Sequence, residues 1–219
     1  MIVVEEVLGR SEVLALREAL DAARFVDGRA TAGPAAMSVK HNQQARGDDP
    51  AVIAAGRRVR LALEGAPVMR RLVRPVRWSG LIFSRYGPGQ QYGLHADNAG
   101  MYAADGGPLR TDVSFTVFLS DPEACEGGEL SIEDGAGGRM FRPPAGSAVL
   151  YPTGLLHRVM PVTAGVRLAC VGWVQSLVRR PDQREILFDL EGLRDETSGD
   201  ASLILDKTIG NLLRMWGEG

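Results

Sequence analysis

The run Asp112-Val-Ser-Phe-Thr-Val-Phe-Leu-Ser120 places an apolar side chain at every second position. Residues 113, 115, 117 and 119 therefore share one face, which is the period of a β-strand. Residues 76–86 alternate in a similar way, and shorter runs follow them, several separated by glycine-rich or proline-rich turns. We expect these further strands at residues 129–133, 147–151, 158–162 and 166–177. So many short strands within about 100 residues predict a sandwich, a barrel or a jelly roll.

Helical patterns precede the β-rich region. A first helix is predicted with Ser11 as its cap, because the apolar residues at positions 13, 16, 20 and 23 fall on one face. A second helix is predicted with Asp49 as its N-cap and Pro50 at its first position, ending at Gly65. We also expect a strand near residues 36–40 and a short helical turn at residues 68–73.

The pattern becomes helical again after Val178. Pro181 begins one predicted helix, and a break at residues 198–200 separates it from a last one. The apolar residues expected to face inward are Ile186, Leu187, Leu190 and Leu193 in the first, while the second carries Leu205, Leu212 and Trp216. The chain is thus expected to comprise an N-terminal helical and strand support region (1–75), a β core (76–178) and a C-terminal helical extension (179–219).

Composition and charge exclude several classes of protein. The 219 residues include 25 Lys and Arg against 27 Asp and Glu, and 45% are hydrophobic. This is ordinary globular composition, and its near-neutral balance argues against nucleic acid or an anionic membrane as the main partner. No stretch approaches roughly 18 uncharged apolar residues, and the N-terminus lacks the basic region of a secretory signal. We therefore expect a cytoplasmic protein with no membrane span, in which Cys125 and Cys170 are reduced.

The scarcest residues restrict the chemistry most. There are only two cysteines and three histidines, namely His41, His95 and His157. A cysteine-rich zinc or iron–sulfur site is therefore excluded, and any metal site must combine histidines with carboxylates. Any histidine-based catalysis has at most these three candidates.

His95-Ala-Asp97 is the first such combination, because residues two apart on a strand point to the same side. His157 follows 60 residues after Asp97, directly before a predicted strand. Arg167 lies ten residues further, on an apolar strand face where an unpaired cation would be costly. A dianionic ligand would relieve that cost through a two-pronged salt bridge. Two histidines and one carboxylate with open positions are typical of non-haem Fe(II) oxygenases.

Three longer runs resemble one enzyme superfamily. Residues 85–98, Arg85-Tyr-Gly-Pro-Gly-Gln-Gln-Tyr-Gly-Leu-His-Ala-Asp-Asn98, resemble the iron-site region of Fe(II)/2-oxoglutarate-dependent dioxygenases of the prolyl/lysyl-hydroxylase type. Residues 110–122 followed by Gly127-Gly-Glu-Leu130 resemble its central strands, and residues 157–167 its third ligand and co-substrate arginine. Three further runs, at residues 27–33, 39–44 and 173–176, resemble those of the bacterial PKHD-type hydroxylases, a subgroup linked with iron uptake.

This resemblance implies a double-stranded β-helix, or jelly-roll, core with flanking helices. It implies that His95, Asp97 and His157 hold Fe(II), that Arg167 binds the distal carboxylate of 2-oxoglutarate and that Tyr86 contacts this co-substrate. The implied reaction uses O2 to decarboxylate 2-oxoglutarate to succinate and CO2 and to hydroxylate an unactivated C–H bond, with ascorbate as an expected reductant. The substrate would be a small molecule or an amino-acid side chain.

One position departs from the family pattern. Some prolyl hydroxylases carry a second co-substrate tyrosine in the middle strand, at about the place of Phe118. Phenylalanine has no hydroxyl, so the polar partner beside Arg167 stays open. Thr116 could take this role only if it faces inward, and the strand period places it on the same side as Phe118.

Several alternatives remain open from the residues alone. Seven arginines lie between residues 50 and 80 against one acid, Glu64, which is most simply a solvated helix face and otherwise an anion-binding surface. That cluster motivates a nucleic-acid demethylase as the alternative function, although the net charge and the lack of interleaved aromatics count against it. A third hypothesis is a sensor that binds iron or 2-oxoglutarate without turnover. Asn98 is a candidate for the substrate side, His41 is not expected to bind metal, and the C-terminal helices could form a homodimer contact.

Overall fold

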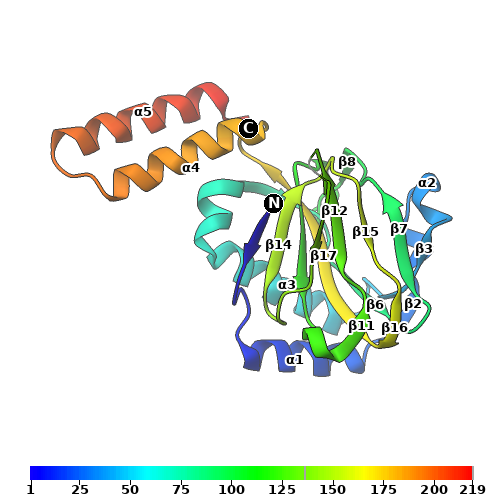
Figure 1. The fold of residues 1–219 in the computed structure, drawn as a ribbon. Helices are drawn as coiled ribbons and strands as arrows, with labels where there is room; N and C mark the ends of the chain where they lie inside the picture. The colour runs from blue at the N-terminus through cyan, green and yellow to red at the C-terminus, as the bar shows by residue number, and fades with distance from the viewer. Residues whose placement is uncertain (136, 219) are drawn as a thin grey trace.

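Two facing β-sheets form the centre of the molecule in the computed structural model, which describes residues 1–135 and 137–218 (Figure 1). Every strand pair in the two sheets is antiparallel. The strand order of the larger, major sheet is β1-β14-β10-β17-β6-β4-β2, and β5 also pairs with β17. The strand order of the smaller, minor sheet is β13-β12-β15-β7-β3. This confirms the predicted jelly-roll core with flanking helices. The major sheet consists of β1 (Ile2–Val4), β2 (Phe25–Asp27), β4 (Gln43–Ala45), β5 (Pro75–Trp78), β6 (Ile82–Tyr86), β10 (Val113–Phe118), β14 (Ala148–Pro152) and β17 (Arg167–Ser176). The minor sheet consists of β3 (Lys40–His41), β7 (Gln91–His95), β12 (Leu130–Asp134), β13 (Gly137–Phe141) and β15 (His157–Val159).

Shorter elements connect and cover the sheets. Two small ribbons pair β8 (Gly100–Tyr102) with β9 (Pro108–Arg110) and β11 (Cys125–Gly127) with β16 (Val162–Gly165). Single turns of helix are η1 (Gly28–Thr31), η2 (Met69–Val73) and η3 (Pro122–Ala124), and the α-helices are α1 (Arg10–Asp21), α2 (Pro34–Met37), α3 (Pro50–Gly65), α4 (Pro181–Asp195) and α5 (Asp200–Trp216). None of the helices in residues 1–135 and 137–218 has both the length and the apolarity to span a bilayer.

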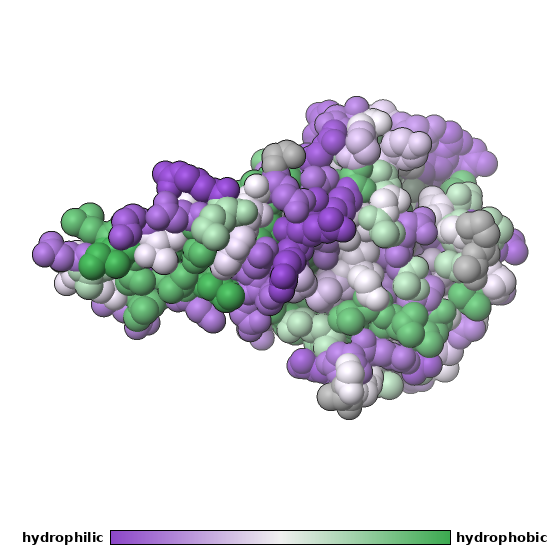
Figure 2. All heavy atoms as spheres, turned by 90° about the horizontal axis from the view of Figure 1, so that it is seen from above, coloured by the Kyte–Doolittle hydropathy of each residue, from purple (hydrophilic) through white to green (hydrophobic). Residues whose placement is uncertain are grey.

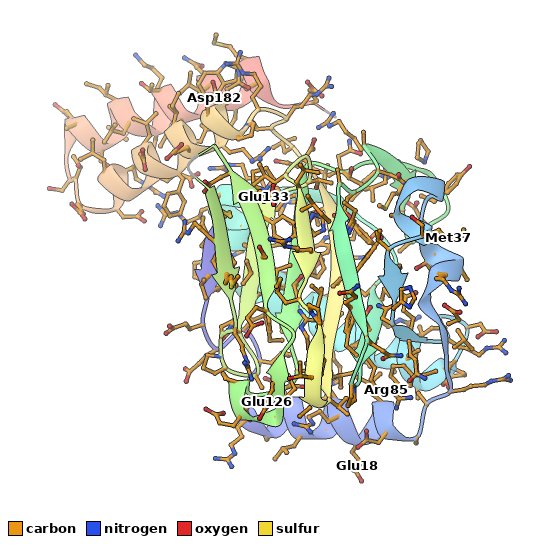
Figure 3. The ribbon with its side chains drawn as sticks, turned by 45° about the vertical axis from the view of Figure 1, so that its right-hand side comes forward. Glu18, Met37, Arg85, Glu126, Glu133 and Asp182 are labelled. Atoms are coloured by element: carbon orange, nitrogen blue, oxygen red, sulfur yellow. The ribbon has the colours of Figure 1, made fainter. Side chains whose placement is uncertain are left out.

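Successive side chains of β10 point alternately into the main hydrophobic core and into the cavity between the two sheets. Val113, Phe115 and Val117 belong to the main hydrophobic cluster, together with the buried faces of α1 and α3. The intervening Ser114 and Thr116 line the cavity between the sheets. Because successive side chains of a strand point to opposite faces, one strand serves both environments. Figure 3 shows the side chains that fill the space around these strands.

Three local predictions for the first 86 residues were wrong. The first helix is capped by Gly9 rather than Ser11, and the Gly9 N–H donates to the Glu12 carboxylate. Residues 34–37 form helix α2, so only Lys40–His41 is strand there. Residues 76–86 are not one strand, because β5 and β6 pair with β17 in registers that differ by one residue. The extra residue lies in the irregular link at residues 79–81, where Ser79 exchanges hydrogen bonds with Trp173.

Helices α4 and α5 form a hairpin that projects away from the sheets (Figure 1). Leu187 is buried and packs with Leu190 in the cluster between the two helices, as predicted. The prediction that Ile186 and Leu193 also face inward was wrong, since they are 44% and 53% exposed. A projecting helix buries only the narrow stripe against its partner, so the edges of its apolar face stay in solvent.

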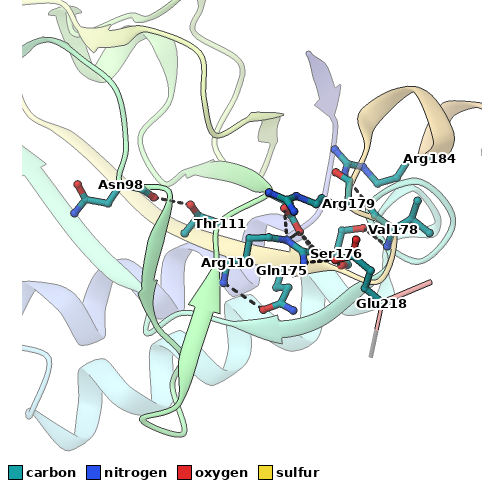
Figure 4. Close-up of polar contacts among 10 residues, drawn as sticks. Asn98, Arg110, Thr111, Gln175, Ser176, Val178, Arg179, Arg184 and Glu218 are labelled. Atoms are coloured by element: carbon teal, nitrogen blue, oxygen red, sulfur yellow. Dashed lines mark hydrogen bonds and ion pairs between the residues drawn. The ribbon is translucent and has the colours of Figure 1, made fainter. Parts of the chain in front are cut away.

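A polar cluster attaches this hairpin to the core (Figure 4). Arg110 Nε donates to the Asp112 carboxylate at 2.8 Å, and the backbone N–H of Ser176 donates to Asp112 Oδ2 at 2.8 Å. Arg110 also pairs with Glu218 beyond α5, while Arg184 of α4 donates to the carbonyl of Val178 at 2.9 Å. Asp112 thus holds the end of β17 from which the hairpin emerges.

The variant Asp112→Ala is expected to lower the free energy of unfolding by about 2 kcal/mol, the scale of hydrogen bonds to a buried charged group. Urea denaturation followed by circular dichroism measures this. The control Asp206→Ala removes an exposed carboxylate of α5 and should change stability by less than about 0.5 kcal/mol. Equal effects of the two substitutions would show that Asp112 does not anchor the hairpin.

Candidate metal and co-substrate site

The structure brings together His95, Asp97 and His157. His95 ends β7 and His157 begins β15, and the two residues are directly paired across the minor sheet. Asp97 follows β7, with Oδ1 3.8 Å from His95 Nε2 and Oδ2 3.5 Å from His157 Nε2. One donor atom from each residue lies within 4.8 Å of the others, so the three can hold one metal ion.

Hydrogen bonds set the orientation of both histidine rings. His95 Nδ1 lies 2.8 Å from the carbonyl of Gly93, and His157 Nδ1 lies 3.0 Å from the carbonyl of Leu155. A carbonyl can only accept, so each Nδ1 carries the proton and each Nε2 presents a lone pair. Burial, reinforced by His157, lowers the pKa of His95 to about 4, which keeps that ring neutral near pH 7.

The Asp97 carboxylate is held from the opposite sheet. Trp173 Nε1 donates to Asp97 Oδ2 at 2.8 Å and Ser114 Oγ donates to it at 2.9 Å. Bonds of this kind orient a metal-binding carboxylate. Sequence reasoning did not find the role of Trp173 or of Ser114, because neither residue type signals such a contact alone.

Arg167 is a buried cation that forms no ion pair with the residues that the structure describes. It is 3% exposed on β17, and its guanidinium carbon lies 5.2 Å from the ring centroids of both Tyr86 and Phe118. Within the described residues, Arg167 Nε and Nη2 have no hydrogen-bond partner. Burial lowers the pKa of Arg167, although Tyr86 partly opposes this. An unsatisfied guanidinium facing a cavity fits a ligand carboxylate, which accepts two parallel hydrogen bonds from it.

Tyr151 adds a phenol that sequence reasoning missed. It lies on β14, lines the same cavity as Arg167, and its ring centroid is 5.1 Å from that of His157. Burial raises the pKa of Tyr151, while the Thr116 hydroxyl and the Arg167 charge act in the opposite direction. Thr116 does face inward, as its strand period predicted. Only folding brings β14 to this position beside β10, so no local pattern in the sequence points to Tyr151.

A cavity of about 260 Å³ connects these groups. The segment from η1 to β4 supplies the buried Lys40 to its lining, and the loop after β7 supplies Asn98. Asn98 is therefore at the cavity, as predicted for a substrate-side residue, whereas His41 is exposed and does not line it. The lining also includes Thr31, Gly33, Ala36, Gln44, Leu94 and Met101.

The arginine-rich region lies outside this cavity. Arg71 and Arg74 pair with Glu191 of α4, Arg77 pairs with Asp105, and Arg60 pairs with Glu64. The other three arginines, Arg57, Arg58 and Arg70, are exposed. The cluster therefore consists of intramolecular ion pairs and a solvated helix surface.

Similarity to known proteins identifies the class. Residues 81–175 match the 2OG-Fe(II) oxygenase superfamily. A PKHD-type hydroxylase of Synechococcus elongatus is 44% identical over 100% of both chains, and one of Xanthomonas campestris is 43% identical over 98% of both. The chain therefore belongs to the PKHD-type hydroxylases, enzymes of the 2OG-Fe(II) oxygenase superfamily. It is accordingly a hydroxylase with Fe(II) as cofactor and 2-oxoglutarate as co-substrate.

Solved structures share the fold at low sequence identity. A prolyl-4-hydroxylase of Pseudomonas putida superposes with a TM-score of 0.55 at 23% identity, covering 80% of this chain and 91% of the other. HygX of Streptomyces hygroscopicus, solved with nickel and 2-oxoglutarate bound, gives a TM-score of 0.57 at 20% identity, covering 81% and 83%. These similarities confirm the double-stranded β-helix fold.

The residues present fit both groups that this family uses. His95, Asp97 and His157 form the only cluster of three or more histidine, cysteine or acidic side chains in the described residues that could hold a metal ion. Two imidazoles and one carboxylate are the donor set of non-haem Fe(II) oxygenases. The unpartnered Arg167 guanidinium fits a carboxylate of 2-oxoglutarate.

Burial of Lys40 gives a prediction for stability. Burial lowers its pKa from 10.5 to about 8, so the unfolded chain binds more protons between these values and stability rises with pH across that window. Lys40→Met should therefore raise the free energy of unfolding at pH 7 by about 1–3 kcal/mol, since it removes a desolvated charge. Urea denaturation should show this gain shrinking between pH 8 and pH 10.5.

The matched control for that experiment is Lys207→Met, because Lys207 is exposed on α5 and is the only other lysine. It should leave stability unchanged. A loss of stability in Lys40→Met at pH 7 would contradict the prediction, and would mean that the contacts of Lys40 outweigh the cost of burying its charge.

Proposed function

We propose that His95, Asp97 and His157 bind Fe(II) and that Arg167 binds the distal carboxylate of 2-oxoglutarate. The enzyme then hydroxylates an unactivated C–H bond of a small molecule or an amino-acid side chain, and 2-oxoglutarate is oxidatively decarboxylated to succinate and CO2. The observation that carries this proposal is the unpartnered, buried Arg167 guanidinium in the same cavity as the three-residue cluster. No fourth acidic or histidine ligand joins that cluster among the described residues, which leaves positions open for co-substrate and O2.

Bound to these residues, Fe(II) would activate O2 for the oxidation, and the protein supplies position and a dry surrounding. Arg167 fixes one end of the co-substrate and thereby aims its keto-acid end at the histidine–aspartate cluster. Tyr86 and Phe118 pack against the guanidinium and exclude water, which strengthens its attraction for a carboxylate. Ser114 and Trp173 hold the Asp97 carboxylate still.

Anaerobic addition of Fe(II) and 2-oxoglutarate should produce a metal-to-ligand charge-transfer band in the visible spectrum. We expect His157→Ala to lose this band. Arg167→Ala should weaken co-substrate binding by about 2–5 kcal/mol, the loss expected when one partner of a buried charge pair is removed. Titration of the band with 2-oxoglutarate measures both effects. An unchanged spectrum in His157→Ala would refute the ligand assignment, and equal affinity in Arg167→Ala would make this arginine structural.

Tyr151 is proposed to supply the hydroxyl that Phe118 lacks. Its phenol lies in the cavity with Arg167, where it can donate a hydrogen bond to the same co-substrate carboxylate. Tyr151→Phe should weaken 2-oxoglutarate binding by about tenfold, as expected for one hydrogen bond to a charged group. The exposed Tyr102 offers the matched control Tyr102→Phe, for which no change is expected. Unaltered affinity in Tyr151→Phe would remove Tyr151 from the co-substrate site.

The biological setting extends the proposal. We propose that the enzyme is cytoplasmic, and the free cysteines Cys125 and Cys170 support this proposal. Ascorbate would maintain the iron as Fe(II), and a link to iron acquisition rests on the family resemblance. Deletion of the gene should then impair growth under iron limitation, and normal growth would argue against that link. Substrate-stimulated release of succinate from a metabolite pool would identify the substrate.

Two other functions are less well supported. A nucleic-acid demethylase would use the arginine-rich region, but four of its seven arginines pair with acids of the same chain. Absence of DNA binding at low salt would dispose of that function. A sensor without turnover would bind Fe(II) and 2-oxoglutarate but release no succinate, so a succinate assay separates it from a hydroxylase.

We also propose a three-part organisation, in which residues 1–75 support the core at 76–178 and residues 179–219 form a homodimer contact. The support for the contact is the exposed apolar surface of the α4–α5 hairpin, which includes Leu203 at 67% and Met215 at 72% exposure. Figure 2 shows hydrophobic side chains gathered on the hairpin. Analytical ultracentrifugation should find a dimer that Leu203→Glu dissociates, and a monomeric wild type would refute it.

A further inference from the structure

Lys40 is a second buried cation of the cavity. It is 4% exposed and lines the cavity from β3, whereas Arg167 lines it from β17 of the other sheet. Lys40 is paired directly with Tyr92 of β7, the strand that ends at His95. It is also one of only two lysines in a chain with 25 basic residues, so a lysine at this position is not a consequence of composition.

The contacts of Lys40 leave part of its hydrogen-bonding capacity unused. Its ammonium donates to Thr31 Oγ1 at 2.9 Å and lies 4.9 Å from the centroid of the Tyr92 ring. Thr31 in turn donates to Gln44 Oε1 at 2.7 Å, which fixes the acceptor in place. No carboxylate forms an ion pair with Lys40 in the described residues, and Asp97 and Asp27 attract it only from a distance. An ammonium has three N–H donors, so a further acceptor can bind.

The charges of the loaded site leave Lys40 in excess. This reasoning rests on the proposed function, in which Fe(II), Asp97, Arg167 and the 2-oxoglutarate dianion occupy one cavity. The formal charges of these four groups cancel, so no negative charge among them is left to balance the positive charge of Lys40. A buried charge is stable only when it is paired or hydrogen-bonded, and a substrate group of one negative charge would pair it.

We propose that Lys40 binds a carboxylate of the substrate, and thereby selects substrates that carry a singly charged anionic group. Thr31 and Gln44 position the ammonium, which contacts the Tyr92 ring, and that ring is stacked on His95 at a centroid distance of 3.6 Å. Leu94 and Met101, which also line the cavity, offer apolar contact to the rest of the substrate.

Nuclear magnetic resonance of protein labelled only at lysine tests this directly, since Lys40 and Lys207 give just two side-chain signals. The protein is loaded with Zn(II), which does not react with O2, and with saturating 2-oxoglutarate, so that Arg167 is occupied. The probes are acetate and its neutral analogue acetamide. Acetate should shift the Lys40 signal saturably while Lys207 hardly moves, and acetamide should shift neither. The variant Lys207→Arg assigns the two signals.

Binding of isotope-labelled acetate gives a second measurement. Lys40→Met should weaken acetate binding by about tenfold or more, as for loss of a charge-assisted hydrogen bond. Lys40→Arg should restore most of it, and Lys207→Met should have no effect. Acetate that leaves the Lys40 signal unmoved, moves both lysines alike, or binds Lys40→Met as tightly as wild type would overturn the proposal.

Failure of this proposal can be told apart from failure of the proposed function. A wild-type protein that forms the charge-transfer band with Fe(II) and 2-oxoglutarate, yet shows no acetate effect at Lys40, retains the co-substrate site and loses only the substrate assignment. A wild-type protein without the band loses the proposed function itself.

Discussion

The carboxylate of Asp97 connects the two sheets, and the rest of the site depends on that connection. Asp97 follows β7 of the minor sheet, but its Oδ2 accepts hydrogen bonds from Ser114 and Trp173, which belong to strands of the major sheet. His95 and His157 are already neighbours because their strands pair. Asp97 therefore closes the cluster from the third side, and its hydrogen bonds fix the spacing between sheets at the point where the chemistry is proposed to occur.

The same strands build both the hydrophobic core and the cavity. On β17, Leu168 and Cys170 belong to the cluster that packs on the helices, while Arg167 and Trp173 face the interior. A slip of one residue in the pairing of β17 would exchange these faces, moving Arg167 into the apolar core. Burial of the apolar face thus specifies the register, and the register in turn positions the groups that the proposed chemistry needs.

The basic side chains of this protein occupy two different kinds of surroundings. Outside the cavity, arginines such as Arg71 and Arg74 form ion pairs with acids of the same chain. In the cavity, Arg167 and Lys40 are buried without an acidic partner in the described residues. Burying an unpaired cation lowers the stability of the folded protein. A ligand that binds at either internal cation can therefore stabilise the fold strongly. A carboxylate brought by a ligand would convert an unfavourable burial into a favourable pair.

By itself the sequence predicted the strand within residues 112–120 and helix α3, because alternation and helix capping are local properties. It suggested the grouping of His95, Asp97, His157 and Arg167 mainly through the resemblance of longer runs to a known enzyme family. It could not place the one-residue register change between β5 and β6, since that depends on which residues β17 offers as partners. It also could not find Tyr151 or Ser114 as members of the site. Each acts through neighbours far away in the chain, and only the closure of one sheet over the other brings those neighbours within reach.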